Sequence, residues 1–155
     1  MWVPPEMRDP ALLHAYTHKS VGYWGAVRLC DGKLVYRREG GMFNKVTCTE
    51  FLPQFYRQST RGPRRVVVNS DNAQYHHSRM HKDWRAEVAP KFELSFLPPA
   101  SPDLNPIERV GKLARRRGVH NRYFPKLSDV TQTVEGTFEE WRRGNETLRP
   151  LCTIT

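Results

Sequence analysis

The sequence predicts an α/β fold in which helices flank a mixed β-sheet. Short runs of β-branched and aromatic residues alternate with segments of helical spacing along the chain. Their order is strand, strand, helix, strand, helix, strand, helix, helix, which is typical of a sheet covered on its faces by helices. A chain of 155 residues is long enough for one domain with a substantial core.

The N-terminal part predicts a β-hairpin after an irregular lead-in. Residues 1–19 contain three prolines and little periodicity, so we expect irregular structure there. Apolar residues alternate over 20–29 and predict a strand, and the Asp31-Gly32 pair predicts a turn. Residues 34–38 then predict the second strand of the hairpin.

The middle of the chain predicts a helix, a strand, a second helix and a second strand. The first helix should begin near Asn44, and Pro53 should bend it or end it early. The three consecutive valines within 64–71 predict a strand buried on both faces. A helix over 78–88 and a strand over 92–97 follow.

Two helices are expected in the C-terminal part, over 106–117 and 129–142. The second carries apolar residues at the spacing of one helix face, and these are Val130, Val134, Phe138 and Trp141. We expect this face to pack on the core.

Charge and cysteine content limit the classes of function. Lys and Arg number 25 against 16 acidic residues, a formal charge of +9, which favours a polyanionic partner such as nucleic acid. A basic protein that binds no polyanion remains an alternative. The cysteines Cys30, Cys48 and Cys152 form no C-x-x-C pair, which argues against a disulfide framework or a zinc knuckle. No apolar run approaches the ~20 residues of a membrane span, so we expect an intracellular protein without a membrane partner.

Two acidic residues occupy positions suited to catalysis. Asp71 follows the valine strand, at the sheet edge where ligands gather in α/β folds. Glu108 opens a helix after the next strand. Each also has a purely structural interpretation, since Asp71 fits an Asx turn and Glu108 fits a capping box with Asn105 before Pro106. Taken together, the two carboxylates predict a divalent-cation site for phosphoryl transfer.

Three stretches resemble the catalytic domain of mariner-type transposases in the bacterial insertion-sequence branch. They are VVVNSDNAQYHH, FLPPASPDLNPIER and RRRGVHNRYF, and the likeness extends over essentially the whole chain. This resemblance implies an RNase H-like fold with an Asp-Asp-Glu triad, in which Asp71 is the second acid and Glu108 the third. It further implies Mg²⁺ or Mn²⁺ as cofactor, DNA as partner, and an endonuclease that acts in DNA transposition, recombination and integration. A bacterial, cytoplasmic and nucleoid-associated protein would follow. Residues 20–128 would be a partial catalytic domain, and 129–155 the C-terminal helix and tail of the same domain.

The same motifs supply accessory residues. Asn72 and His76 belong to the D-N-A-x-x-H motif and Asn105 to the S-P-D-L-N-P-I-E motif. Basic residues at three-to-four spacing after Glu108 predict a stripe that holds DNA phosphates, and these are Arg109, Lys112, Arg115 and Arg116. A solvated helix face is the structural alternative. His77 and His81 also stand four apart, but without a third ligand nearby we do not predict a zinc site.

The sequence departs from the family pattern in two ways. The resemblance places the first acid on a central strand upstream of WVPP, and neither Asp9 nor Asp31 ends an apolar strand that could replace it. At Gly111 the family pattern usually has an aromatic residue. We therefore expect the chain to be inactive alone, with the missing strand supplied by an upstream transposase segment or a second copy, or compensated by rearrangement. The alternatives are a non-catalytic DNA-binding remnant and an RNase H-type nuclease acting on RNA–DNA hybrids.

Overall fold

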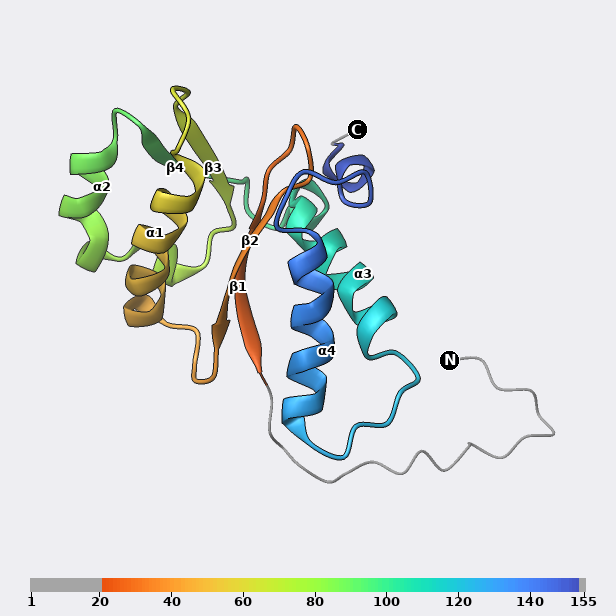
Figure 1. Ribbon diagram of the computed structural model, residues 1–155. Helices are drawn as coiled ribbons and strands as arrows, with labels where there is room; N and C mark the ends of the chain where they lie inside the picture. Colours follow the sequence, from red (N-terminus) through yellow and green to blue (C-terminus); the bar gives the residue numbers. More distant parts are fainter. Residues whose placement is uncertain (1–20, 154–155) are drawn as a thin grey trace.

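The structure, a computed structural model, describes residues 21–153 (Figure 1). Its strands and helices in chain order are β1 (Gly22–Val27), β2 (Leu34–Glu39), α1 (Lys45–Ser59), β3 (Val66–Ser70), α2 (Lys82–Val88), β4 (Phe92–Phe96), α3 (Pro106–Gly118) and α4 (Leu127–Glu140). Short 3₁₀ helices connect them, namely η1 (Gln74–His77), η2 (Arg79–His81), η3 (Pro102–Leu104) and η4 (Arg149–Cys152). The irregular lead-in predicted for residues 1–19 lies outside the described residues.

The predicted β-hairpin is confirmed. β1 and β2 pair antiparallel, with Gly22 opposite Glu39 and Val27 opposite Leu34. The turn is closed by the Arg28 N–H, which donates to the Lys33 carbonyl at 2.8 Å. Gly32 has φ +74°, and a Cβ there would lie 2.7 Å from the backbone nitrogen of Arg149. Glycine is therefore required both by the turn and by the close approach of the C-terminal segment.

Helix α1 begins at its predicted position, but the expected early end at Pro53 was wrong. Asn44 accepts hydrogen bonds from the N–H groups of Val46 and Thr47, and Thr47 completes a capping box. The helix then continues through Pro53 to Ser59. An interior proline costs a helix about 3 kcal/mol, whereas a buried large apolar side chain contributes about 1.5–3 kcal/mol. Four buried side chains on both sides of Pro53 outweigh its cost, and these are Cys48, Phe51, Leu52 and Phe55.

The strands form two small sheets, not the single mixed sheet that the sequence predicts. β1 pairs with β2, and β3 pairs in parallel with β4, with Val66 opposite Phe92. Among residues 21–153, no hydrogen-bonded ladder joins β1 to β3. The whole is a mixed α/β arrangement of four helices and two two-stranded sheets within the described range, consistent with part of an RNase H-like fold.

Strand β3 differs from its predicted environment. The valine run predicts burial on both faces, yet Val67, the middle valine of the run, is 55% exposed. Burial alternates along β3, so one face of the strand packs on the core while the face that carries Val67 is left open. Val66 and Val68 are partly buried against the core next to α1.

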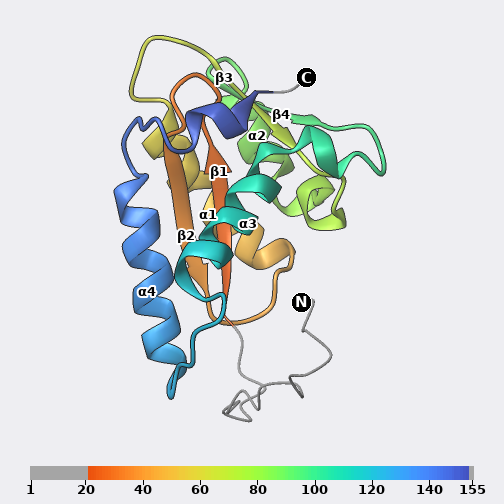
Figure 2. The same cartoon turned by 90° about the vertical axis from the view of Figure 1, so that its right-hand side faces the viewer.

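Two hydrophobic clusters lie on opposite faces of the hairpin. Trp24 and Val35 contribute to the cluster under α1, which also includes Phe92 of β4. Leu34 contributes to the cluster under α3 and α4, with partly buried Tyr23 beside it. Side chains in a strand alternate between faces, so the hairpin supplies residues to both. Figures 1 and 2 show the resulting order of layers, with α1 on one side of the hairpin and α3 and α4 on the other.

The remaining helices match the predictions with shifted ends. The segment 78–88 is divided, because Ser78 caps η2 and the α-helix begins only at Lys82. On α4, Phe138 is buried, and Trp141 directly after the helix is 1% exposed, as the predicted apolar face requires. In the described part of the chain, every helix is too short or too polar to cross a bilayer.

Candidate active site

Asp71 lies immediately after β3, where the sequence places it. Its Oδ1 accepts a hydrogen bond from the Ala73 N–H at 3.2 Å, which is the Asx turn considered from the sequence. The same oxygen is 3.1 Å from Nε2 of His76. The Asp71 side chain is 56% exposed, so the carboxylate is held in place by two donors and remains open to solvent.

His76 lies between Asp71 and a buried thiol. Its Nδ1 is 3.7 Å from Sγ of Cys48, and its imidazole packs edge-on against Trp24. Burial lowers the pKa of His76, and the negative charge of Asp71 opposes that shift. The neutral ring is therefore favoured. A proton on Nε2 donates to Asp71, which leaves Nδ1 to accept from the Cys48 S–H.

The Cys48 contact is absent from the sequence-based prediction. Cys48 has no exposed surface, and its burial raises the pKa of the thiol to about 11. A nucleophilic role would require the thiolate, which is disfavoured here. The spacing of Cys48 on the apolar face of α1 identifies it as a core residue, and no local signal indicates that His76, 28 positions away, would lie against it.

Asn72 ties the loop after β3 to the end of β4. Its Nδ2 donates to the Leu97 carbonyl, and its Oδ1 lies 3.3 Å from Nε2 of His77. The His77 ring in turn stacks on Phe96 at 3.9 Å between centroids. Asn72 thus fixes the position of the residue next to Asp71.

The second histidine of the i, i+4 pair has a different environment. His81 lies on η2 and is 1% exposed, and its Nε2 is 3.0 Å from the Tyr75 carbonyl. His77 belongs to the preceding 3₁₀ helix and contacts Asn72. The two side chains have separate partners and do not lie on one face of an α-helix.

Glu108 occupies the first turn of α3. The Oδ1 of Asn105 accepts from the Ile107 N–H at 3.4 Å, so Asn105 is the helix cap and Pro106 is the first helical residue. The Glu108 N–H bonds to the backbone carbonyl of Asn105. The prediction that Glu108 completes a capping box was wrong, because its carboxylate is exposed and accepts no hydrogen bond from another described residue.

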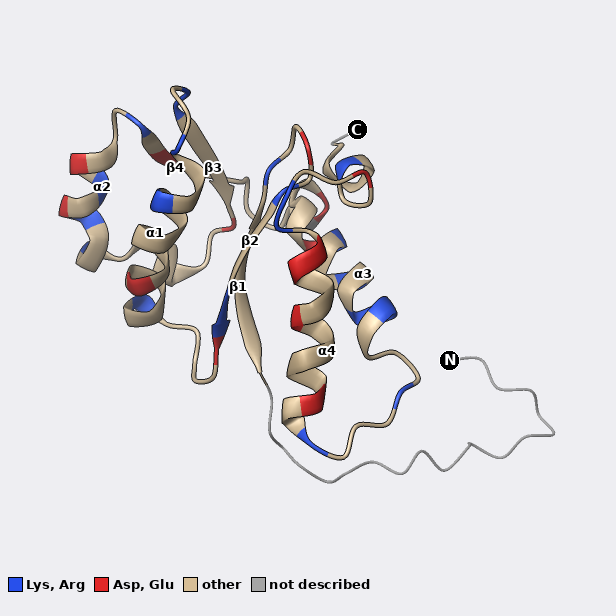
Figure 3. Ribbon diagram, viewed as in Figure 1, with Lys and Arg blue, Asp and Glu red and all other residues tan. Residues whose placement is uncertain are grey.

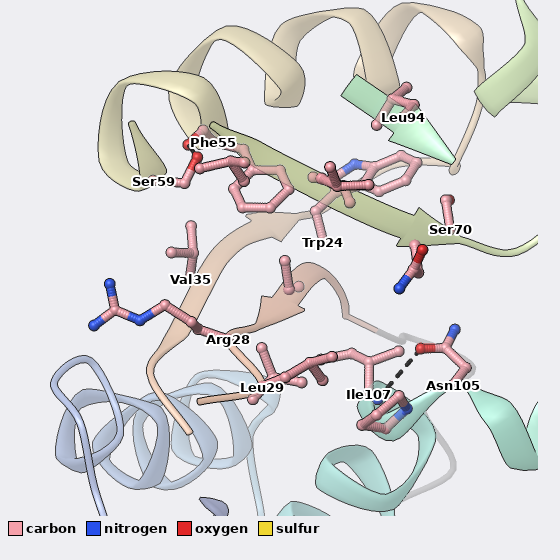
Figure 4. A pocket seen from close by; sticks show the side chains of 18 of the residues that line it. Trp24, Arg28, Leu29, Val35, Phe55, Ser59, Ser70, Leu94, Asn105 and Ile107 are labelled. Carbon is pink, nitrogen blue, oxygen red and sulfur yellow. Dashed lines mark hydrogen bonds between the residues drawn. The ribbon is translucent and has the colours of Figure 1, made fainter. Parts of the chain in front are cut away.

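A single cavity connects the two regions. It has a volume of about 590 Å³ and is lined by Asp71 and His76 from the segment after β3 and by Asn105 and Ile107 from the start of α3. Figure 4 shows Ser70, which ends β3, and Asn105, which caps α3, on the same side of this cavity. Glu108 itself is not a lining residue, although it directly follows Ile107.

The donor set suits a hard divalent cation only in part. Mg²⁺ prefers carboxylate oxygens and is commonly held by one or two carboxylates together with substrate phosphates. Asp71 and Glu108 would supply two such groups. Among residues 21–153, no group of three or more potential metal-ligating side chains is assembled.

The predicted basic stripe on α3 divides into two parts. The guanidinium of Arg109 donates to the backbone carbonyls of Leu151, Thr153 and Asp103 at 3.0, 2.7 and 2.8 Å. It therefore holds the C-terminal segment and η3 against α3. The other three basic residues of the predicted stripe are exposed, and these are Lys112, Arg115 and Arg116. Figure 3 colours the basic residues of α3 blue.

Gly111 lies among these residues on α3. A Cβ built at this position would have no atom within 4 Å, so the glycine is not required by packing.

Comparison with known proteins identifies the family. A family described as DDE superfamily endonuclease matches residues 1–131. The chain is also 38% identical over 50 residues to "Uncharacterized protein y4pE/y4sA" of Sinorhizobium fredii (strain NBRC 101917 / NGR234). That alignment covers 32% of this chain and 37% of the relative, so the chain spans little more than a third of the protein it matches. Because the family match extends over most of the sequence, the chain belongs to the DDE superfamily of endonucleases.

Proposed function

We propose that this chain is part of the catalytic domain of a DNA transposase from the mariner-type, bacterial insertion-sequence branch. Its reaction would be metal-dependent phosphodiester cleavage followed by strand transfer. The observation that carries the proposal is that Asp71 and the residues directly before Glu108 line one cavity. Membership of the DDE superfamily of endonucleases supports the same reaction class.

Each site residue has a role in this proposal. Asp71 and Glu108 would hold the cation, and Asn72 and His76 would keep the Asp71 carboxylate in place through the contacts described above. Asn105 would fix where α3 starts and thus where Glu108 lies. When bound, Mg²⁺ or Mn²⁺ would stabilise the negative charge that develops on the phosphate.

DNA would be held mainly by phosphate contacts. Lys112, Arg115 and Arg116 are exposed on α3, whose first turn carries Glu108. Contacts of this kind position a duplex without reading its sequence. Arg109 is the least available of the four predicted residues, because its guanidinium already serves three carbonyls.

The test is nicking of supercoiled plasmid in the presence of Mg²⁺ or Mn²⁺. Two proteins would be compared, namely the chain alone and the chain extended at its N-terminus by an apolar strand bearing the first acid. We expect little cleavage by the chain alone and clear cleavage by the extended protein. Robust nicking by the chain alone would contradict the expected dependence on an upstream acid.

Substitutions at the two acids test the assignment of the site. In the extended protein, Asp71→Asn and Glu108→Gln should each abolish nicking. Asp83→Asn and Glu87→Gln provide matched controls, since both residues are exposed on α2 and neither lines the cavity. Retention of cleavage in both site variants would refute the nuclease assignment.

A second candidate is a non-catalytic DNA-binding remnant. The exposed basic residues on α3 favour it, together with Gly111, which departs from the family pattern without a packing reason. This candidate predicts a salt-dependent gel shift with duplex DNA and no cleavage even after the N-terminal extension. An RNase H-type nuclease would be favoured instead if the extended protein cut RNA–DNA hybrids in preference to duplex DNA.

A further inference from the structure

The two acids of the candidate site are held in different ways. Oδ1 of Asp71 accepts from the Ala73 N–H at 3.2 Å and lies 3.1 Å from Nε2 of His76. The Glu108 carboxylate is exposed and accepts no hydrogen bond from another described residue. The position of this second carboxylate therefore depends on where the backbone of the first turn of α3 lies.

The backbone that leads to Glu108 has few short hydrogen bonds of its own. Residues 98–106 include four prolines, which have no N–H to donate. The cap bond from the Ile107 N–H to Oδ1 of Asn105 is 3.4 Å long, which exceeds the usual range of about 2.7–3.2 Å. The Glu108 N–H donates to the Asn105 carbonyl at 3.1 Å. These bonds alone hold the entry into α3 only weakly.

Arg109, the residue after Glu108, makes shorter bonds from the same turn. Its Nη2 donates to the Asp103 carbonyl in η3 at 2.8 Å. Its Nη1 donates to the carbonyls of Leu151 and Thr153 at 3.0 and 2.7 Å. The guanidinium thus connects the segment that enters α3 with the C-terminal segment, which Figure 1 shows beside α3.

The C-terminal segment is itself anchored in the core. Leu148, directly before η4, is fully buried and belongs to the same hydrophobic cluster as Val110 of α3. The Leu148 N–H donates to Oδ1 of Asn145 at 2.8 Å, and Nδ2 of Asn145 donates to the Gly32 carbonyl in the hairpin turn at 2.9 Å. The bonds of Arg109 therefore fix the entry into α3 to a well-packed part of the molecule.

The same geometry argues against a DNA contact for Arg109. Nη1 uses both of its hydrogens on backbone carbonyls, and Nη2 uses one, so a phosphate would have to compete with these carbonyls. Lys112 lies one turn later on α3 and differs in this respect. It is exposed, and its ammonium makes no hydrogen bond or ion pair with another described residue.

We propose that Arg109 is a positioning residue for Glu108, and that the C-terminal segment Arg149–Thr153 supports the active site through it. Arg109 touches neither the DNA nor the cation. It fixes the first turn of α3, and with it the place of the Glu108 carboxylate relative to Asp71. Glu108 holds the cation in the proposed function, on which this role depends.

Arg109→Lys is the most informative variant. It keeps a positive charge that a phosphate would accept, and it removes the planar fork that reaches three carbonyls. Arg109→Ala removes both. Arg57→Ala is the matched control for the loss of a positive charge, since Arg57 is exposed in the last turn of α1 and its guanidinium makes no hydrogen bond or ion pair with another described residue. All measurements are made well below the Tm of each variant.

Hydrogen exchange of the full 155-residue chain, followed by mass spectrometry, tests the connection itself. Residues 103–108 should exchange about 10-fold faster in Arg109→Lys and Arg109→Ala than in the wild type, because the bonds that hold the entry into α3 are lost. Exchange in β3, over 66–70, should not change, and Arg57→Ala should match the wild type in both regions. Unchanged exchange over 103–108 in both Arg109 variants would overturn the proposal.

Binding of the chain to a fluorescent duplex at several salt concentrations separates positioning from phosphate contact. A residue that neutralises one phosphate contributes about 1 to the slope of log K against log salt. We expect Lys112→Ala to reduce this slope by about 1, and Arg109→Ala to keep the wild-type slope as Arg57→Ala does. A slope reduced by about 1 in Arg109→Ala and restored in Arg109→Lys would make Arg109 a DNA contact and overturn the proposal.

Nicking of supercoiled plasmid by the N-terminally extended protein gives the kinetic readout. Arg109→Lys should lower kcat about 10-fold with KM unchanged, because a displaced Glu108 weakens the reaction step and leaves DNA binding intact. Lys112→Ala should raise KM with kcat unchanged. A raised KM with unchanged kcat in Arg109→Lys would contradict the positioning role. If the extended wild type does not nick, the proposed function fails, while the exchange and salt measurements still decide whether Arg109 fixes α3 or binds DNA.

Discussion

Replacement of Arg109 by alanine should destabilise the protein more than any other change to the basic residues of α3. The guanidinium donates three hydrogen bonds of 2.7 to 3.0 Å to backbone carbonyls in η3 and the C-terminal segment. A net contribution of about 1 kcal/mol for each hydrogen bond predicts that the free energy of unfolding falls by about 2–3 kcal/mol. We use the lower part of the range for hydrogen bonds to charged groups, because Arg109 is partly exposed. For a domain of this size, 1 kcal/mol shifts Tm by about 2–4 °C, so we expect Tm to fall by about 4–12 °C.

Urea unfolding followed by tryptophan fluorescence measures this loss, and calorimetry gives Tm. Arg116→Ala is the matched control, because its guanidinium is exposed on the same helix and makes no hydrogen bond to another described residue. It should change the free energy of unfolding by no more than about 0.5 kcal/mol while weakening DNA binding. If Arg109→Ala is as stable as the wild type and loses only DNA affinity, then the structural role assigned to this guanidinium is incorrect.

Further predictions concern stability, pH and thiol chemistry. Gly111→Ala should raise the free energy of unfolding by about 1 kcal/mol, since a helical glycine is replaced where a Cβ meets open space, whereas Gly32→Ala should lower it. Calorimetry distinguishes the two, and a loss of stability in Gly111→Ala would show that the position is packed. The pKa of His76 is lowered on folding, so its contribution to stability is complete above about pH 6.5 and is lost as the pH falls through the lowered pKa. Urea unfolding from pH 7.5 to 5 should show this loss as a fall in the free energy of unfolding, and the fall should be smaller in His76→Gln. If the free energy of unfolding depends on pH equally in both proteins, His76 is not the group responsible. Cys48, whose pKa is raised to about 11 by burial, should resist alkylation at pH 8 in the folded protein while exposed Cys30 reacts. Mass spectrometry of the labelled peptides checks this, and equal labelling would mean that Cys48 is accessible.

The sequence predicts the individual elements well where local chemistry specifies them. Asn44 and Asn105 cap helices at the predicted positions, because a side-chain acceptor before an apolar-periodic segment is a local signal. The hairpin follows from alternation around Asp31-Gly32 in the same way. Pro53 shows the limit of this reasoning, since the burial of its neighbours on α1 outweighs a local helix-breaking signal.

The sequence does not predict how the elements assemble. The valine run of β3 indicates a strand that pairs on both sides. Pairing depends on which other strands lie beside it in the fold, and among residues 21–153 β3 pairs only with β4. The same holds within the candidate site. The contacts of Arg109 with Leu151 and of His76 with Cys48 join positions 42 and 28 residues apart, and spacing along the chain carries no information about either.

The β1–β2 hairpin is the shared wall of both hydrophobic clusters. Trp24 and Val35 face one cluster, and Leu34 faces the other. Because both clusters pack on the same hairpin, unfolding of one cluster removes the packing that holds the hairpin in place for the other. Heat should therefore disrupt both clusters together in one cooperative transition. An error in the hairpin turn would for the same reason compromise the entire molecule, including regions that the turn never touches.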